Sequence, residues 1–166
     1  MEDRRSLEQR IRAWLVVFVV CLVLSGATAF PLVHEVRWVD GWGLPGAVGD
    51  WISHVREGLD ATDAKYPFML YGTDWLAFAH LVIAVAFYGV WRDPVRNVWV
   101  VEWAMIACVG IIPLAAICIP LRGLPLWWMP IDMAFGVFGI VPLLVLRRMI
   151  KRLEHSGTAS PVPAGV

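Results

Sequence analysis

The chain has few charged residues, few cysteines and none of the short motifs that mark the common soluble enzymes. Lys, Arg, Asp and Glu make up 17% of the sequence, against about 25% in an average soluble domain. It contains no GxxxxGK[ST] nucleotide loop and no GxSxG, HExxH or CxxC motif. The common soluble-enzyme chemistries therefore lack their usual signatures in this sequence.

The cysteines do not form a pattern that indicates disulfides or a metal site. Cys21, Cys108 and Cys118 all lie within apolar segments, where a free thiol acts as a small hydrophobic residue. Polar residues between the first two apolar segments, His34, Glu35, Asp50 and His54, match no zinc-binding spacing. The sequence therefore predicts no metal site, and it indicates no particular cofactor.

Long hydrophobic runs dominate what the sequence does contain. Four runs, at residues 13–33, 74–91, 94–120 and 125–146, are each near the roughly 20 residues that a membrane-spanning helix needs. They are too long and too uniformly apolar for barrel strands of about 10 residues. The sequence predicts an all-α integral membrane protein, a four-helix bundle over residues 1–154 with a disordered tail at 155–166.

Basic residues are distributed unevenly around these runs. Ten lie before the first run, between the second and third, or after the fourth, and four lie on the other side. The positive-inside rule then places both termini in the cytoplasm. Short basic clusters beside hydrophobic segments suit anionic lipid headgroups and give little support to nucleic-acid binding.

The segment between the first two runs is long for a plain connection. Apolar residues recur at helical spacing over residues 47–58, with a polar face opposite. We expect an extracytoplasmic amphipathic helix there. Ala27-Thr28-Ala29 also resembles a signal-peptide cleavage site, but the apolar stretch continues to residue 33, which favours a retained first helix.

Ionisable residues within the runs are the candidate functional residues. A helix rise of about 1.5 Å per residue places His80 and Asp132 roughly 10 Å below the outer boundary, so a pair across the second and fourth helices is geometrically allowed. Two readings remain open: a ligand anchor or acid/base pair, with both residues as candidate catalytic groups, and a structural hydrogen-bonded pair. The candidate ligand-binding set is Asp74, Trp75, His80, Glu102, Trp128 and Asp132.

Three of these residues carry further expectations. Asp132, Gly136 and Gly139 share one helix face, and small residues at such spacing let helices approach closely. Glu102 lies in the inner half of its helix, within reach of Arg92 or Arg96, so a structural ion pair or a proton entry is expected there. Asp74 is expected to favour the start of its helix, with Thr73 as the cap.

Several stretches resemble a group of small bacterial four-helix inner-membrane proteins without an assigned activity. The stretches are Tyr-Gly-Thr-Asp-Trp-Leu-Ala-Phe-Ala-His (71–80), Arg-Asp-Pro-Val-Arg-Asn (92–97), Ile-Asp-Met-Ala-Phe-Gly-Val-Phe-Gly (131–139) and Ser-Gly-Ala-Thr-Ala-Phe-Pro (25–31). The layout is also similar to the EXPERA group of sterol isomerases and sigma-2-receptor-like proteins, which have acidic residues in an apolar pocket. That likeness implies such parts for Glu102 and Asp132.

Three functions fit these features. The first is an intrabundle pocket for an apolar or amphipathic, lipid-like small molecule, with acid/base turnover as an extension. The second is an accessory or assembly subunit that contacts a partner membrane protein. The third is a small proton-coupled transporter, which would need to form a homo-oligomer because four helices without a repeat are few for a transporter.

Overall fold

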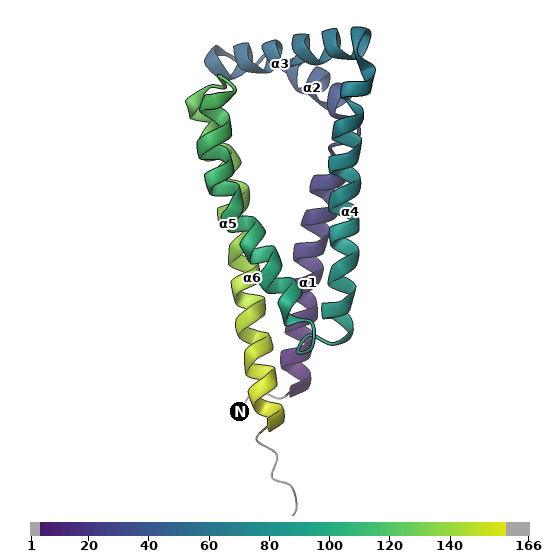
Figure 1. Ribbon diagram of the computed structural model, residues 1–166, viewed down its shortest axis with the longest axis vertical. Helices are drawn as coiled ribbons and strands as arrows, with labels where there is room; N and C mark the ends of the chain where they lie inside the picture. The colour runs from purple at the N-terminus through teal and green to yellow at the C-terminus, as the bar shows by residue number, and fades with distance from the viewer. Residues whose placement is uncertain (1–3, 159–166) are drawn as a thin grey trace, which may run out of the picture. The chain divides into compact units, whose positions relative to one another are not determined.

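The computed structural model describes residues 4–158, and within this range helices joined by turns form the whole fold (Figure 1). In order they are α1 (Arg4–Ala27), α2 (Leu32–Asp40), α3 (Gly46–Lys65), the 3₁₀ turn η1 (Pro67–Met69), α4 (Tyr71–Arg92), α5 (Val98–Leu121), the 3₁₀ turn η2 (Leu126–Trp128) and α6 (Met129–Thr158). Four segments are long and apolar enough to cross a membrane: Arg4–Ala27, Pro67–Arg92, Val98–Leu121 and Leu126–Ser156. The predicted all-α class with four such helices is confirmed.

The chain divides into two compact units. The loop unit comprises residues 20–85, and the core unit comprises the described parts of residues 1–19 and 86–166. The division falls within α1 and α4, so each of these helices contributes one end to each unit.

The hydropathy pattern predicts one helix over residues 13–33, and the structure differs from this prediction. Helix α1 begins at Arg4, and its Leu7, Ile11 and Leu15 form a buried stripe at four-residue spacing. It ends at Ala27 because Pro31 has no amide hydrogen to donate to the helix. The chain turns over residues 28–31 and continues as the separate helix α2.

The predicted amphipathic helix at 47–58 is longer than expected. Helix α3 spans Gly46–Lys65, so Gly58 lies inside it and does not end it. Added Cβ atoms at Gly58 would meet nothing within 4 Å, and the Gly58 carbonyl accepts a 2.7 Å hydrogen bond from Thr62 Oγ1. Thr73 is likewise inside α4 rather than at its cap, with its hydroxyl bonded to the Leu70 carbonyl at 2.6 Å.

Helix α5 begins at Val98 and not at the expected Pro94, because a turn separates it from α4. Asn97 Nδ2 donates to the carbonyl oxygens of Gly89 and Asp93, both at 2.9 Å. A carboxylate oxygen of Asp93 accepts the Arg96 amide at 3.0 Å. These bonds satisfy the end of α4 locally, and residues 94–97 form a turn instead of a helical start.

The link between α5 and α6 ends α5 with a glycine in the left-handed region. Gly123 has φ 66°, its amide bonds to the Pro120 carbonyl, and the Leu124 amide bonds to Ile119, which is a Schellman motif. Helix α6 then begins at Met129, after η2, and not at the expected Pro125.

Helix α6 is also longer than the apolar run that predicts it. Its 30 residues correspond to about 45 Å, against a hydrocarbon core of about 30 Å. The expected disordered tail from residue 155 is therefore wrong for residues 155–158, which are helical. The rest of that tail, residues 159–166, lies outside the described residues.

Buried apolar side chains are concentrated in the core unit, where α1 begins, α4 ends and α6 runs beyond the predicted span. The fully buried large side chains there are Ile11, Leu15, Phe87, Val90, Val101, Leu143, Leu146 and Ile150. By contrast, many apolar side chains along the four long helices are exposed, for example Ile106, Leu114 and Phe138. Such surfaces suit contact with lipid rather than water.

Helices α5 and α6 pack side by side in the core unit (Figure 1). A Cβ added to Gly136 would collide with the backbone carbonyl of Cys108, and one added to Gly139 would lie 3.0 Å from Cys108 Sγ. The prediction that this small-residue face lets two helices approach closely is confirmed at these two glycines.

Candidate functional site

His80 is held by its own helix and by a close neighbour in α1. Its Nδ1 lies 2.7 Å from the Leu76 carbonyl oxygen. Because a carbonyl only accepts, Nδ1 must carry the hydrogen, and in the neutral ring Nε2 is then the acceptor nitrogen. A Cβ on Gly26 would lie 2.5 Å from His80 Cβ, so the imidazole projects from a tightly packed helix contact within the loop unit.

Asp74 and Asp132 occupy matching places in α4 and α6. Each is the fourth residue of its helix, each lies seven residues after a proline, and a single 3₁₀ turn precedes each helix. A carboxylate in the first turn complements the positive end of a helix by about 0.3–1 kcal/mol. The expectation that Asp74 favours its helix start agrees with this position, and Asp132 shares it.

The Asp132 carboxylate at this position is half-buried and has no polar partner among the described residues. Its side chain is half-buried, and within residues 4–158 it makes no hydrogen bond or ion pair. Gly136, one turn further along α6, lies against Cys108 of α5. The carboxylate therefore lies one helical turn before the contact of Gly136 with α5, with its acceptor oxygens uncommitted within residues 4–158.

Glu102 is in the opposite situation, since it forms an ion pair. Its Oε1 lies 2.8 Å from Nε of Arg147 in α6. The expected partners Arg92 and Arg96 are therefore wrong, because the antiparallel α5–α6 hairpin brings Arg147 to the level of Glu102. The pair neutralises the carboxylate and links the two helices, which supports the structural reading of this residue.

The two candidate tryptophans belong to aromatic contacts at helix starts. Trp75 is exposed on α4, and its ring lies edge-on to Phe78 with centroids 6.1 Å apart. Trp128, half-buried in η2, lies edge-on to Trp127 at 5.7 Å. Both positions suit the aromatic belt of a membrane interface.

The structure groups the candidates by unit. Asp74, Trp75 and His80 belong to the loop unit, with Asp74 and Trp75 at the start of α4 and His80 further along the same helix. Glu102, Trp128 and Asp132 belong to the core unit. Each group is described within its own unit, and the His80–Asp132 pair stays a prediction.

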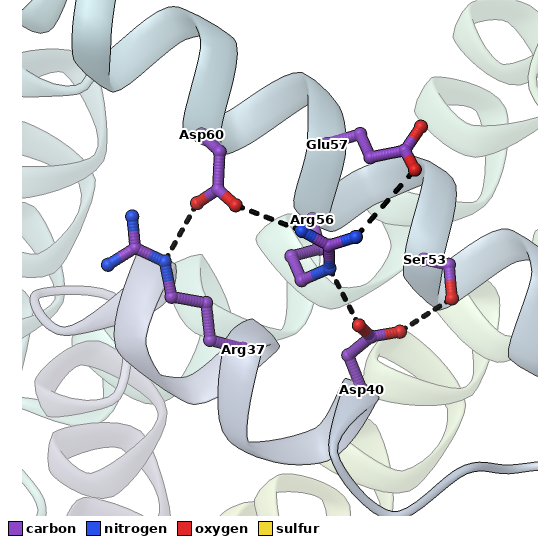
Figure 2. Close-up of polar contacts among 6 residues, drawn as sticks. All are labelled: Arg37, Asp40, Ser53, Arg56, Glu57 and Asp60. Carbon is purple, nitrogen blue, oxygen red and sulfur yellow. Dashed lines mark hydrogen bonds and ion pairs between the residues drawn. The ribbon is translucent and has the colours of Figure 1, made fainter.

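A polar cluster that we did not predict from the sequence joins α2 to α3 (Figure 2). Arg37 Nε lies 2.7 Å from Oδ1 of Asp60, and Arg56 Nη1 lies 3.1 Å from the other oxygen of the same carboxylate. Arg56 Nε lies 2.6 Å from Asp40, which also accepts the Ser53 hydroxyl at 2.6 Å. These ion pairs and hydrogen bonds hold α2 against α3 along their polar faces.

The contacts in this α2–α3 cluster also shift the pKa values of Asp40 and Arg56. The Ser53 hydroxyl, together with the hydrogen bond and charge of Arg56, holds the pKa of Asp40 below its ordinary value, although desolvation opposes the shift. The bond to Asp40 likewise raises the pKa of Arg56. The signal in the sequence was the spacing of Ser53, Arg56 and Asp60, which places all three on one helical face.

Neither a glycine motif near this cluster nor the arrangement of possible metal ligands indicates a ligand site. Residues 41–46 match the spacing GxGxxG, but they follow helix α2 rather than a strand, so the dinucleotide-binding context is missing. Among the described residues, no three His, Cys, Asp or Glu side chains gather into a possible metal site.

The fold and these residues define the class of multi-pass helical membrane proteins, with a few ionisable side chains in the candidate spans. Comparison adds no closer relation: no family model matches the chain, and neither a curated protein nor a solved structure shows significant similarity to it.

Proposed function

We propose that this chain is a bacterial inner-membrane protein that binds an apolar or amphipathic small molecule, with Asp132 as the polar anchor. The observation that carries the proposal is the contrast between two carboxylates of the core unit. Glu102 is neutralised by Arg147, whereas half-buried Asp132 has no partner within residues 4–158. A carboxylate in a membrane-spanning segment is costly unless it is paired or hydrated, so a ligand with a cationic or hydrogen-bond-donating end would stabilise it.

His80, on α4 in the loop unit, is a separate candidate group of this proposal and is argued from its own unit. Its Nδ1 is committed to Leu76, so Nε2 is the nitrogen that would accept a ligand hydroxyl or exchange a proton. Acid/base turnover of the bound molecule is an extension of the same proposal and needs this nitrogen.

The proposed orientation puts both termini in the cytoplasm and α3 on the outer side. It is supported by the excess of basic residues in the first turns of α1, from the end of α4 to the turn before α5, and in the last turns of α6. In this orientation Asp74 and Asp132 begin their helices at the outer face.

The test is native mass spectrometry of gently solubilised wild type, Asp132→Asn, His80→Ala and the control Asp50→Asn. Asp50 is an exposed carboxylate of α3, so its loss changes charge without touching the anchor. We expect a discrete small molecule on wild type and the control, and its loss from Asp132→Asn and His80→Ala.

A thermal melt of the same variants separates binding from helix-end stabilisation. Asp132 could act only by complementing the positive N-terminal end of α6. In that case Asp132→Asn lowers the melting temperature of the delipidated protein but leaves ligand retention unchanged, and this result contradicts the proposal. A stoichiometric partner chain without a selective small molecule would instead identify an accessory subunit.

A further inference from the structure

The core unit contains a cavity that the proposed site does not use. Its volume is about 250 Å³, and it lies where the first turns of α1, the last turn of α4 and the following turn approach Leu153 of α6. Drug-sized ligands fill pockets of roughly 300–1,000 Å³, so this cavity suits a headgroup better than a whole molecule. None of the six candidate residues lines it.

Three arginines, Arg4, Arg12 and Arg92, and two acidic residues line the cavity. Within residues 4–158, Glu8 has an ion-pair partner, whereas Asp93 accepts a backbone amide and keeps its negative charge. Glu8 pairs with Arg4, whose Nε is 3.2 Å from the carboxylate, and Asp93 accepts the Arg96 amide.

Two guanidinium groups are left without a carboxylate partner within residues 4–158. Arg12 lies over the Trp91 ring, 5.4 Å from its centroid, which orients the guanidinium without neutralising it. Arg92 ends α4 and makes no hydrogen bond or ion pair in the described part of the chain. The cavity therefore presents two guanidinium groups without an ion pair, from two different helices, and its lining is positive by one charge, with three arginines against the carboxylates of Glu8 and Asp93.

The remaining walls are apolar and come from Ile11, Val90, Val95 and Leu153. A free anion would gain nothing from these walls, whereas an anion carried on acyl chains would. Guanidinium groups bind phosphate through paired hydrogen bonds, and basic pockets between membrane helices are suited to anionic lipid headgroups.

We propose that this cavity binds the phosphate of an anionic phospholipid between Arg12 and Arg92. The lipid phosphate completes the ion pairs that the chain leaves open, and the first part of each acyl chain covers the apolar wall. The shared chemistry, a phosphate anion between two arginines, would also admit inorganic phosphate, which lacks the apolar contact.

The experiment uses the full chain in a mild non-ionic detergent, with three probes: phosphatidylglycerol, zwitterionic phosphatidylcholine and inorganic phosphate. Retention is measured by native mass spectrometry, and stabilisation by the shift in melting temperature. Arg12→Gln and Arg92→Gln remove the proposed contacts. Arg5→Gln and Arg148→Gln are matched controls, because both arginines are exposed and neither lines the cavity.

We expect phosphatidylglycerol to bind wild type and both controls, and to bind each cavity variant about tenfold more weakly. Stabilisation by inorganic phosphate alone, lost in the same two variants, would support the phosphate site and exclude the lipid as its source. Equal retention by cavity variants and controls, or equal binding of phosphatidylcholine, would overturn the proposal. Because Asp132 lies outside the cavity, Asp132→Asn should retain phosphatidylglycerol, so the two proposals fail independently.

Discussion

Glu102 of α5 and Arg147 of α6 form an ion pair across the helix hairpin, with Nε and Oε1 2.8 Å apart. The two residues are far apart in sequence, and each lies on a long apolar helix. The pair therefore reports directly on the alignment of α5 against α6.

Removing both members of this pair should cost less than the sum of the two single removals. In Glu102→Gln or Arg147→Gln one charge is left without its partner, whereas the double variant leaves none. A double-mutant cycle should give a coupling energy of about 0.5–1 kcal/mol, since both side chains are partly exposed. Reversible unfolding in mixed detergent micelles measures it.

The Lys151–Glu154 pair of α6, at 3.0 Å, is the matched control. It lies within one helix and should show a coupling of only about 0.3 kcal/mol. Strictly additive effects at Glu102 and Arg147 would show that this contact does not align the hairpin.

Alanine at Gly136 should weaken the packing of α5 on α6. The added Cβ collides with the Cys108 backbone carbonyl, which cannot move without moving the helix, so we expect a loss of about 1–3 kcal/mol. Gly110→Ala is the control, because nothing lies within 4 Å of its Cβ position. It should be neutral or stabilising by up to about 1 kcal/mol. The free energy of unfolding of the two variants checks this.

Gly139→Ala should behave differently from Gly136→Ala, although both glycines face the same residue. Its new Cβ would meet the Cys108 sulfur at 3.0 Å rather than the backbone. Cys108→Ala should therefore relieve Gly139→Ala and leave Gly136→Ala as unstable as before. The same unfolding measurement on the two double variants decides it, and equal rescue of both would contradict the assigned contacts.

Gly26→Ala should separate α1 from α4 within the loop unit. The new Cβ would lie 2.5 Å from His80 Cβ and 3.1 Å from the Ala77 carbonyl, and we expect a loss of about 1–3 kcal/mol. Gly72→Ala, on α4 with nothing within 4 Å, should have little effect. Equal melting temperatures for the two variants would argue against this contact.

Acid should loosen α2 from α3. The pKa of Asp40 is lower in the folded state than its ordinary value of 3.8. The carboxylate therefore contributes its full stabilisation above about that pH and loses it as the pH falls through the lower folded value. Hydrogen exchange of α2 and α3 amides between pH 3 and 7 should show protection falling at the acid end.

Asp40→Asn should remove most of this pH dependence and lower protection at neutral pH. Asp50→Asn, at an exposed position of α3, should change neither. Unchanged protection of the wild type at the lowest pH would show that the bonds of Asp40 do not hold the two helices together.

Hydropathy predicted the four long helices well because their length and composition leave few alternatives in lipid. It failed at the helix ends, which depend on local bonds. The polar start of α1 is helical because its apolar stripe is buried. Helix α5 starts at Val98 because residues 94–97 form a turn, in which the Asn97 side chain bonds to the end of α4. Neither effect changes the hydropathy averaged along the sequence, so a hydropathy pattern cannot locate these helix ends.

The candidate residues show a similar limit. The glycine face of α6 was predictable from spacing, but its partner Cys108 was not, because the apolar residues of α5 cover all sides of the helix around the single charged residue Glu102 and do not indicate which side faces α6. For Glu102 an ion pair was predicted with the wrong arginines. Counting outward from the α5–α6 turn would have pointed towards Arg147, since residues at similar distances from a hairpin turn lie at similar levels.

The buried residues near the end of α6 have a thermodynamic consequence. Met149, Ile150 and Leu153 lie in the part of the helix that exceeds the thickness of the hydrocarbon core. Contacts there are driven by exclusion of water, so their loss should raise the heat capacity, as in a soluble protein. The helix contacts inside the bilayer lack that driving force. On cooling, this end of the protein should therefore weaken while the lipid-embedded contacts keep their strength.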